Sequence, residues 1–165
     1  MAQDPLHFKV LRATTNSMSA VVATHQYAGQ GVVVDPSDPA NFALATNTSL
    51  GTIWLLTRNV EPQQELGDRL VNDLLPHREL ELPDVIGDAC TAREVLEAEY
   101  EGAERLILTG TGDLSSVTGG ESVSWYGGKL REKQSGDVVH GVITGVLTPE
   151  DSANSVRIRV QFTRS

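Results

Sequence analysis

The sequence predicts a mainly β protein, an antiparallel β-sandwich or barrel with at most one or two short helices. First, the chain of 165 residues is rich in glycine and poor in aromatic residues, at 15 glycines and 5% aromatics. This composition favours short strands joined by many turns. Second, turn signals recur, such as the proline- and aspartate-rich residues 35–39. Third, residues 156–163 alternate apolar and polar side chains with a period of two.

The N-terminal part is predicted to contain an arm and several strands. Residues 1–18 are expected to form the arm and a first strand, with a loop signal at residues 14–17. Gly31-Val32-Val33-Val34 is a β-branched strand that stops at the turn of residues 35–39. Residues 42–46 and 52–57 are predicted as two further strands around a turn at 47–51.

The middle of the chain has a less regular pattern. Leu66, Leu70 and Leu74 are spaced four residues apart, which is enough for one short helix within residues 63–75 or for an extended loop. Residues 78–82 alternate and end at Pro83, as expected of an edge strand. Residues 92–101 fit either a helix or a charged strand followed by a turn.

The C-terminal part has the clearest β signal. The predicted strands are residues 105–109, 122–126, 129–133, 138–147 and 156–163. Residues 19–165 are therefore expected to form one β-rich domain. It could be built as two small lobes, 19–60 and 104–165, joined by the acidic segment 61–103.

Charge is concentrated in that acidic segment. The chain carries a formal net charge of −9. Between Glu61 and Glu104 there are 13 acidic residues against three arginines, so this segment accounts for −10 and the remainder of the chain nets +1. Because such a protein is repelled by phosphate backbones, nucleic acid is not an expected partner. No apolar run approaches the ~18 residues of a membrane span, so no membrane partner is expected either.

No catalytic, cofactor or metal motif emerges, and the protein is predicted not to be an enzyme. The four histidines are scattered, and the single cysteine, Cys90, is predicted to be a small buried or half-buried apolar residue. His140 with Asp137 is the nearest approach to a general base, although a packed histidine is the favoured interpretation. The glutamates between positions 94 and 104 are interpreted as a solvated face. Trp54, Trp125 and Tyr126 leave a carbohydrate-binding module open as an alternative.

Part of the chain resembles small head proteins of tailed bacteriophages. The likeness is carried by Gly110-Thr111-Gly112, Trp125-Tyr126-Gly127-Gly128-Lys129-Leu130-Arg131, Ser135-Gly136-Asp137-Val138-Val139-His140-Gly141 and Ser155-Val156-Arg157-Ile158-Arg159-Val160. A strand with a Gly-Lys-Leu-Arg start, a Gly-Asp turn and a closing alternating strand are similar to those of capsid decoration, or cement, proteins. The stretch from Gly31 to Leu56 is similar to a lesser degree. Together these stretches cover about a third of the chain.

The resemblance implies a non-catalytic virion protein, made in the host cytoplasm, that sits on the outer capsid surface. Such a protein clamps neighbouring subunits of the major capsid protein, often as a homotrimer. We expect the arm to contact a neighbour by strand addition or through an apolar anchor formed by Pro5, Leu6 and Phe8. We also expect opposite charges to guide docking. The basic candidates for this role are Lys129, Arg131, Lys133, Arg157 and Arg159.

A second expectation stays within virion architecture. A tail, baseplate or head–tail joining protein would also be β-rich, but it would assemble into a ring through heterologous contacts.

Overall fold

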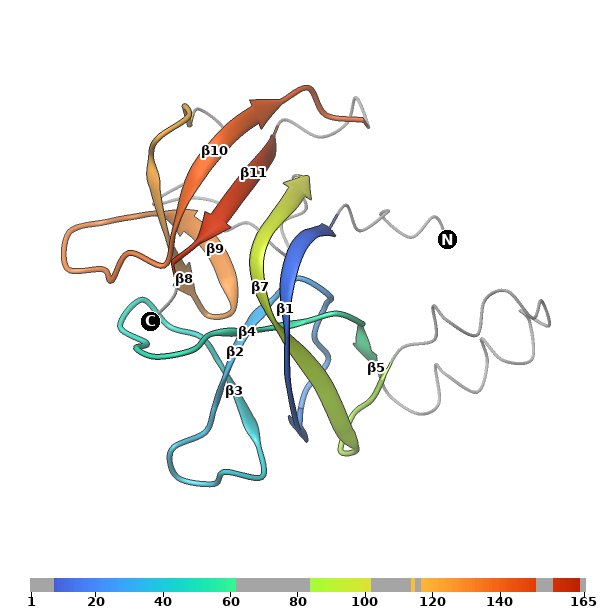
Figure 1. Ribbon diagram of the computed structural model, residues 1–165. Helices are drawn as coiled ribbons and strands as arrows, with labels where there is room; N and C mark the ends of the chain where they lie inside the picture. Colours follow the sequence, from blue (N-terminus) through green and yellow to red (C-terminus); the bar gives the residue numbers. More distant parts are fainter. Residues whose placement is uncertain (1–7, 62–83, 102–113, 115–116, 151–155, 164–165) are drawn as a thin grey trace, which may run out of the picture.

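The computed structural model describes residues 8–61, 84–101, 114, 117–150 and 156–163, and this part of the chain is almost entirely β-structure (Figure 1). Its strands are β1 (Phe8–Val21), β2 (Gly31–Val34), β3 (Phe42–Leu44), β4 (Trp54–Leu56), β5 (Val60–Glu61), β6 (Asp84–Val85), β7 (Ala89–Glu101), β8 (Ser122–Tyr126), β9 (Lys129–Glu132), β10 (Gly141–Leu147) and β11 (Arg157–Phe162). The predicted mainly β fold class is confirmed.

Nine strands form one antiparallel sheet that curls into a half-barrel (Figure 1). Their order is β3-β2-β4-β7-β11-β10-β8-β9, and β1 pairs with the other edge of β7. The short strands β5 and β6 form a separate parallel pair. Within the described residues, no helix is long and apolar enough to cross a membrane.

Strand β7 is the centre of this arrangement. One of its edges pairs with β1 along almost its whole length, from Ala89 to Tyr100. Its other edge pairs first with β4, at Ala92 and Arg93, and then with β11, from Glu97 to Glu101. The partner strand therefore changes between Arg93 and Glu97, and β4 and β11 separate there.

The core joins the N-terminal and C-terminal strands. Leu55 of β4 packs in the same buried cluster as Trp125 of β8 and Ile143 of β10. A second cluster surrounds Cys90, which is fully buried as predicted. Burial raises the pKa of the Cys90 thiol to about 11, so this side chain is a packing residue without thiolate reactivity. The stretches 19–60 and 104–165 thus contribute, through their described residues, to one sheet and one shared core.

Residues 92–101 form a strand, so their helical alternative is wrong. Helix propensity is a weak preference, and here pairing on both edges of β7 overrides it. The other segments interpreted as helix or strand, residues 63–75, 78–82 and 105–109, lie outside the described residues.

The predicted loop at residues 14–17 is instead a bulge within the continuous strand β1. Ala13 is opposite Val95 and Ser17 is opposite Arg93, so residues 14–16 face Glu94 alone. The Asn16 N–H donates to Thr14 Oγ1 over 3.1 Å, a local hydrogen bond that replaces a ladder bond. The threonine, asparagine and serine residues therefore interrupt the pairing without ending the strand.

Gly31 of β2 marks the tightest packing between the two halves of the sheet. A Cβ atom added at Gly31 would lie 2.7 Å from the indole ring of Trp125, whose side chain is fully buried. The absence of a side chain at Gly31 lets β2 approach this ring.

Replacing Gly31 with alanine should therefore destabilise the fold by about 1–3 kcal/mol, because the added methyl group would overlap the indole and force the ring or strand β2 to shift. Urea denaturation measures the change. The matched control is Gly119→Ala, since a Cβ atom at Gly119 would meet nothing within 4 Å. Equal stability of the two variants would contradict the packing at Gly31.

Candidate functional site

The ends of the curled sheet meet at a seam, which we define as the contact of residues 45–51 with the β8–β9 turn and residues 134–140. The Gly31 N–H donates to the Gly128 carbonyl over 3.0 Å, and the Gly128 N–H donates to the Ala45 carbonyl over 2.9 Å. The Val138 N–H donates to the Asn47 carbonyl over 2.9 Å. Gly128 has a φ of 79°, a conformation that favours glycine, so the turn residue itself allows this closure. Strands β3 and β4 are shorter than predicted because the chain between them leaves the sheet to form the seam.

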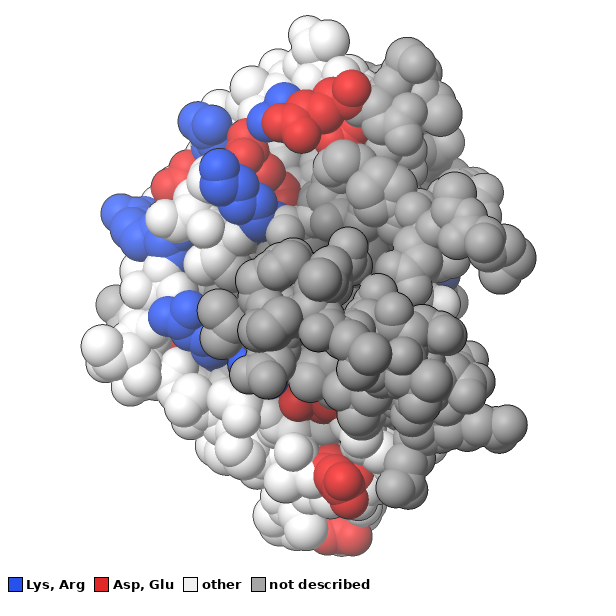
Figure 2. Space-filling view, turned by 90° about the vertical axis from the view of Figure 1, so that its right-hand side faces the viewer, with Lys and Arg blue, Asp and Glu red and all other residues white. Residues whose placement is uncertain are grey.

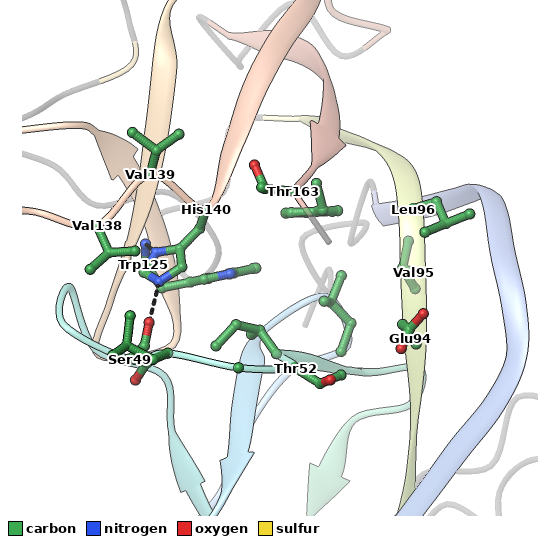
Figure 3. A pocket seen from close by; sticks show the side chains of 15 residues that line it. Ser49, Thr52, Glu94, Val95, Leu96, Trp125, Val138, Val139, His140 and Thr163 are labelled. Carbon is green, nitrogen blue, oxygen red and sulfur yellow. Dashed lines mark hydrogen bonds between the residues drawn. The ribbon is translucent and has the colours of Figure 1, made fainter. Parts of the chain in front are cut away.

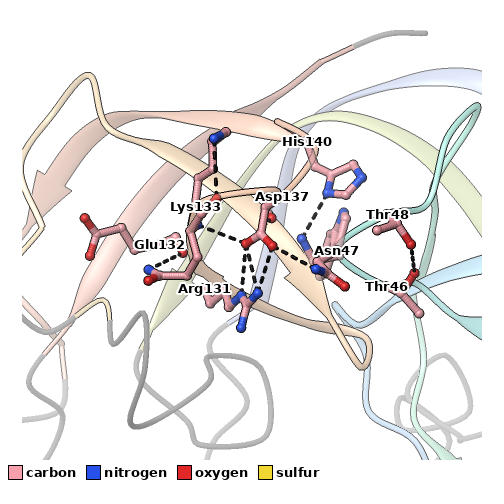
Figure 4. A network of polar contacts seen from close by, with 11 residues as sticks. Thr46, Asn47, Thr48, Arg131, Glu132, Lys133, Asp137 and His140 are labelled. Carbon is pink, nitrogen blue, oxygen red and sulfur yellow. Dashed lines mark hydrogen bonds and ion pairs between the residues drawn. The ribbon is translucent and has the colours of Figure 1, made fainter.

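Asp137 holds the seam together through its carboxylate (Figure 4). Arg131 donates to it through Nε and Nη2 at 2.9 to 3.1 Å, and the side chains are nearly inaccessible to solvent. Asn47 Nδ2 donates to the same carboxylate over 2.8 Å, as do Ser124 Oγ over 3.2 Å and the Gln134 N–H over 2.9 Å. The carboxylate therefore joins β8, β9 and the loop after β3.

These contacts also determine the ionisation of Asp137. Burial by itself would raise the pKa of its carboxyl group, because the charged form loses its hydration. The hydrogen bonds from Arg131, the Gln134 N–H and Asn47 outweigh burial and hold the pKa well below its ordinary value of 3.8. Asp137 is thus a charged structural residue.

His140 is the second polar residue of the seam (Figure 3). Its Nδ1 accepts the backbone N–H of Trp125 over 3.0 Å, which requires Nδ1 to be unprotonated. Nε2 therefore carries the proton and donates it to the Ser49 carbonyl over 2.8 Å. Both ring nitrogens are occupied by backbone groups, so His140 and Asp137 serve the seam as two separate structural residues.

Replacing Asp137 with asparagine should cost about 3 kcal/mol at neutral pH, because the buried Arg131 charge loses its partner. Since folding lowers the pKa of Asp137, the carboxylate stabilises the fold fully above pH 3.8 and loses this effect as the pH falls towards its folded pKa. The stability difference between wild type and variant should therefore narrow below about pH 4.

Urea denaturation at pH 7 and pH 3 measures this difference. The same substitution at the exposed Asp88 is the control and should change stability by less than about 0.5 kcal/mol. If the difference in unfolding free energy between wild type and Asp137→Asn stayed constant with pH, Asp137 would not be a charged structural residue.

An apolar pocket with a volume of about 240 Å³ opens beside the seam (Figure 3). It lies where β7 changes partner, and Glu94, Val95 and Leu96 form its wall on that side. The remaining lining residues are Ser49, Leu50, Gly51, Thr52, Ile53, Leu55, Trp125, Val138, Val139, His140, Phe162 and Thr163. The topology therefore creates the pocket, and the seam fixes one side of it.

Trp125 is the largest buried side chain that lines the pocket. Its ring stacks on Phe162 with centroids 5.7 Å apart and an interplanar angle of 10°. Its Nε1 is buried and has no hydrogen-bond partner among the described residues. Trp125 therefore lines the pocket with an indole ring that packing against Phe162 holds in place.

Two exposed apolar side chains flank the pocket, and we call them the collar. Leu50 is 78% exposed and Val139 is 37% exposed. Both belong to the segments that the seam hydrogen bonds hold in place. Sequence reasoning missed this site, because its residues come from five separate parts of the chain. The one available signal was Leu50, an isolated leucine inside a predicted polar turn.

The basic residues predicted to form a docking face are largely paired within the protein. Arg157 and Arg159 each lie 3.4 Å from the carboxylate of Glu99, and Arg131 pairs with Asp137. Lys133 is exposed and Lys129 half-buried, and neither has an ion pair among the described residues. Figure 2 shows basic and acidic side chains interleaved in its upper left part.

Two of the glutamates that were predicted to form a solvated face are instead buried. Glu99 is 7% exposed and Glu101 is 2% exposed. They lie opposite Arg159 and Arg157 in the β7–β11 register. In the sequence, acidic residues occupy every second position in the last part of β7, and arginines occupy two alternate positions of β11. These matching patterns were the signal that the carboxylates could be paired with arginines and buried. Both glutamates line a second pocket of about 200 Å³ together with Lys9 and Arg157, so its charges are of mixed sign.

Of the three residues predicted to form an apolar anchor, the structure describes one, Phe8. Phe8 packs on Tyr100 with ring centroids 5.2 Å apart, and a Cβ atom at Gly29 would lie 2.8 Å from its ring. Phe8 therefore belongs to the fold. Pro5 and Leu6 lie outside the described residues.

The three aromatic residues of the carbohydrate alternative do not form one surface. Trp125 is fully buried, Trp54 is half-buried in the second core cluster, and Tyr126 is 46% exposed. The Arg131 guanidinium lies 4.1 Å from the centroid of the Tyr126 ring. Only Tyr126 of these three presents an open side chain to a ligand.

The described residues contain no group of three or more histidine, cysteine, aspartate or glutamate side chains that could hold a metal ion. Neither the models of known protein families nor the curated proteins contain a match to this chain.

Proposed function

We propose that this chain is a structural virion protein that binds the outside of a phage capsid and stabilises contacts between major capsid subunits. The observation that carries the proposal is the apolar pocket with its exposed collar. The polar residues beside it, His140 and Asp137, are engaged in holding the seam. A rigid β scaffold with a preformed apolar contact site suits binding to another protein. The resemblance to capsid decoration proteins supplies the identity of the partner.

A protein in this role stabilises the shell through the free energy of its binding. A ligand that binds the closed shell and not its separated subunits stabilises the shell by mass action. If the protein is a homotrimer, three equivalent contacts raise the effective concentration of each, so one contact can be weak. The net charge of −9 favours a position outside a particle filled with DNA.

The internal pairing of the arginines changes how charge could contribute to docking. Arg131, Arg157 and Arg159 neutralise carboxylates of the same chain, and redirecting them to a partner would leave buried acids without their ion pairs. Lys129 and Lys133 are the members of the predicted basic face best placed for an outside contact. Apolar contact is therefore the main component of the proposed interface.

Purified phage particles that contain this chain should carry it in hundreds of copies per head, because a decoration protein binds at every equivalent position of the shell. Quantitative mass spectrometry of intact particles measures the copy number. A tail, baseplate or head–tail joining protein would be present in only a handful of copies, and that result would replace the capsid role.

Deleting residues 2–7 should abolish binding to empty phage heads while the protein stays folded. This deletion removes Pro5 and Leu6 but keeps Phe8, whose ring packs on Tyr100. Co-sedimentation with heads measures binding, and urea denaturation checks the fold. The matched control replaces Gln3 and Asp4 with alanine and should bind like wild type. If the deletion variant bound to heads as well as wild type does, the arm would not be part of the interface.

A further inference from the structure

The pocket beside the seam is preformed, because hydrogen-bonded backbone fixes its walls. The strand β7 and the seam residues Ser49 and His140 hold opposite sides of it. A site that exists before binding loses little conformational entropy when it is occupied. The pocket can therefore take up a partner group without rearrangement.

The size of the pocket limits its occupant. Its volume of about 240 Å³ is below the ~300–1,000 Å³ typical of sites for drug-sized ligands and cofactors. An apolar cavity of ~150 Å³ is enough for a benzene ring. One aromatic or large aliphatic side chain is thus the group that the space suits.

The collar indicates that this side chain belongs to a protein surface. A small molecule inside the pocket would leave Leu50, at 78% exposure, in water. A side chain projecting from a surrounding surface would cover Leu50 and Val139 as well, which is the arrangement of interface anchors within a ring of apolar contacts.

The charge of this chain indicates which kind of partner surface can bind at the pocket. Among the described residues that line the pocket, Glu94 is the one of acidic type, and none is lysine or arginine. The whole chain carries −9, so an acidic partner is repelled and a basic partner is attracted.

We propose that the pocket beside the seam receives a single aromatic or large aliphatic side chain that projects from a basic surface of another protein. The identification of that protein as the capsid subunit rests on the proposed function. The pocket itself can be tested without the capsid.

Three short synthetic peptides serve as probes: one with phenylalanine between two lysines, one with alanine between two lysines, and one with phenylalanine between two glutamates. The Trp54→Phe variant leaves Trp125 as the reporter, through its indole N–H signal in NMR spectra. The Lys-Phe-Lys peptide should shift this signal with a dissociation constant in the millimolar range. The other two peptides should bind at least about fivefold more weakly.

Variants of the exposed apolar residues test the collar. Leu50→Ser should weaken binding of the Lys-Phe-Lys peptide about fivefold or more. Val146→Ser is the matched control, because Val146 is 51% exposed and does not line the pocket. It should bind like the parent protein, and both variants should keep the parent stability.

Several outcomes would overturn the inference. Equal shifts with Lys-Ala-Lys would mean that charge alone attracts the peptide. Binding of benzyl alcohol that is as tight as that of the peptide and insensitive to Leu50→Ser would identify a small-molecule cavity. Dissociation of an oligomer by Leu50→Ser, with head binding unchanged, would identify a second copy as the occupant.

Binding to phage heads separates this inference from the proposed function. If the peptide binds but the protein does not co-sediment with heads, the pocket inference stands and the capsid role fails. If Leu50→Ser loses peptide binding but co-sediments with heads as well as wild type does, the capsid role stands and the capsid subunit is not the occupant of the pocket. If neither peptide binding nor head binding depends on Leu50, the pocket inference fails.

Discussion

The closure of the sheet at the Asp137 carboxylate is the constraint on which the rest of the structure depends. A curled sheet has two ends, and here they are tied by the hydrogen bond from Asn47 to the Asp137 carboxylate and a small set of backbone hydrogen bonds. The buried ion pair with Arg131 holds that carboxylate in place. The loop after β3 gives up sheet pairing to make these contacts. That loop then positions Leu50 and Ser49 beside the pocket. The fold and the candidate site therefore share the same interactions.

The pattern of strands could be predicted because short-range signals specify it. The alternation of residues 156–163 and the β-branched run at Gly31 to Val34 indicate strands without knowledge of their neighbours. The identity of β7 could not be settled in this way, because its helix-forming residues become a strand only when β1 and β11 pair with it. The pocket also could not be predicted from the sequence, since it arises where β7 changes its partner strand.

The pairing of charged residues also depends on contacts between strands that are far apart in the sequence. Arginines in β11 and glutamates in β7 are separated by almost sixty positions, yet Glu99 lies between Arg157 and Arg159. In the sequence they suggest two oppositely charged faces. In the sheet they become neighbours and neutralise each other, so two residues of the predicted basic face, Arg157 and Arg159, form ion pairs between β11 and β7.

The bulge in β1 has a consequence for the behaviour of the protein at high concentration. A long strand at the margin of a sheet offers unpaired amide and carbonyl groups, which can recruit identical chains into fibres. Residues 14–16 break that row of groups near the middle of β1. Each uninterrupted piece is then too short and too twisted to template a neighbour well. The irregularity thus disfavours edge-to-edge pairing of β1 between copies of this chain.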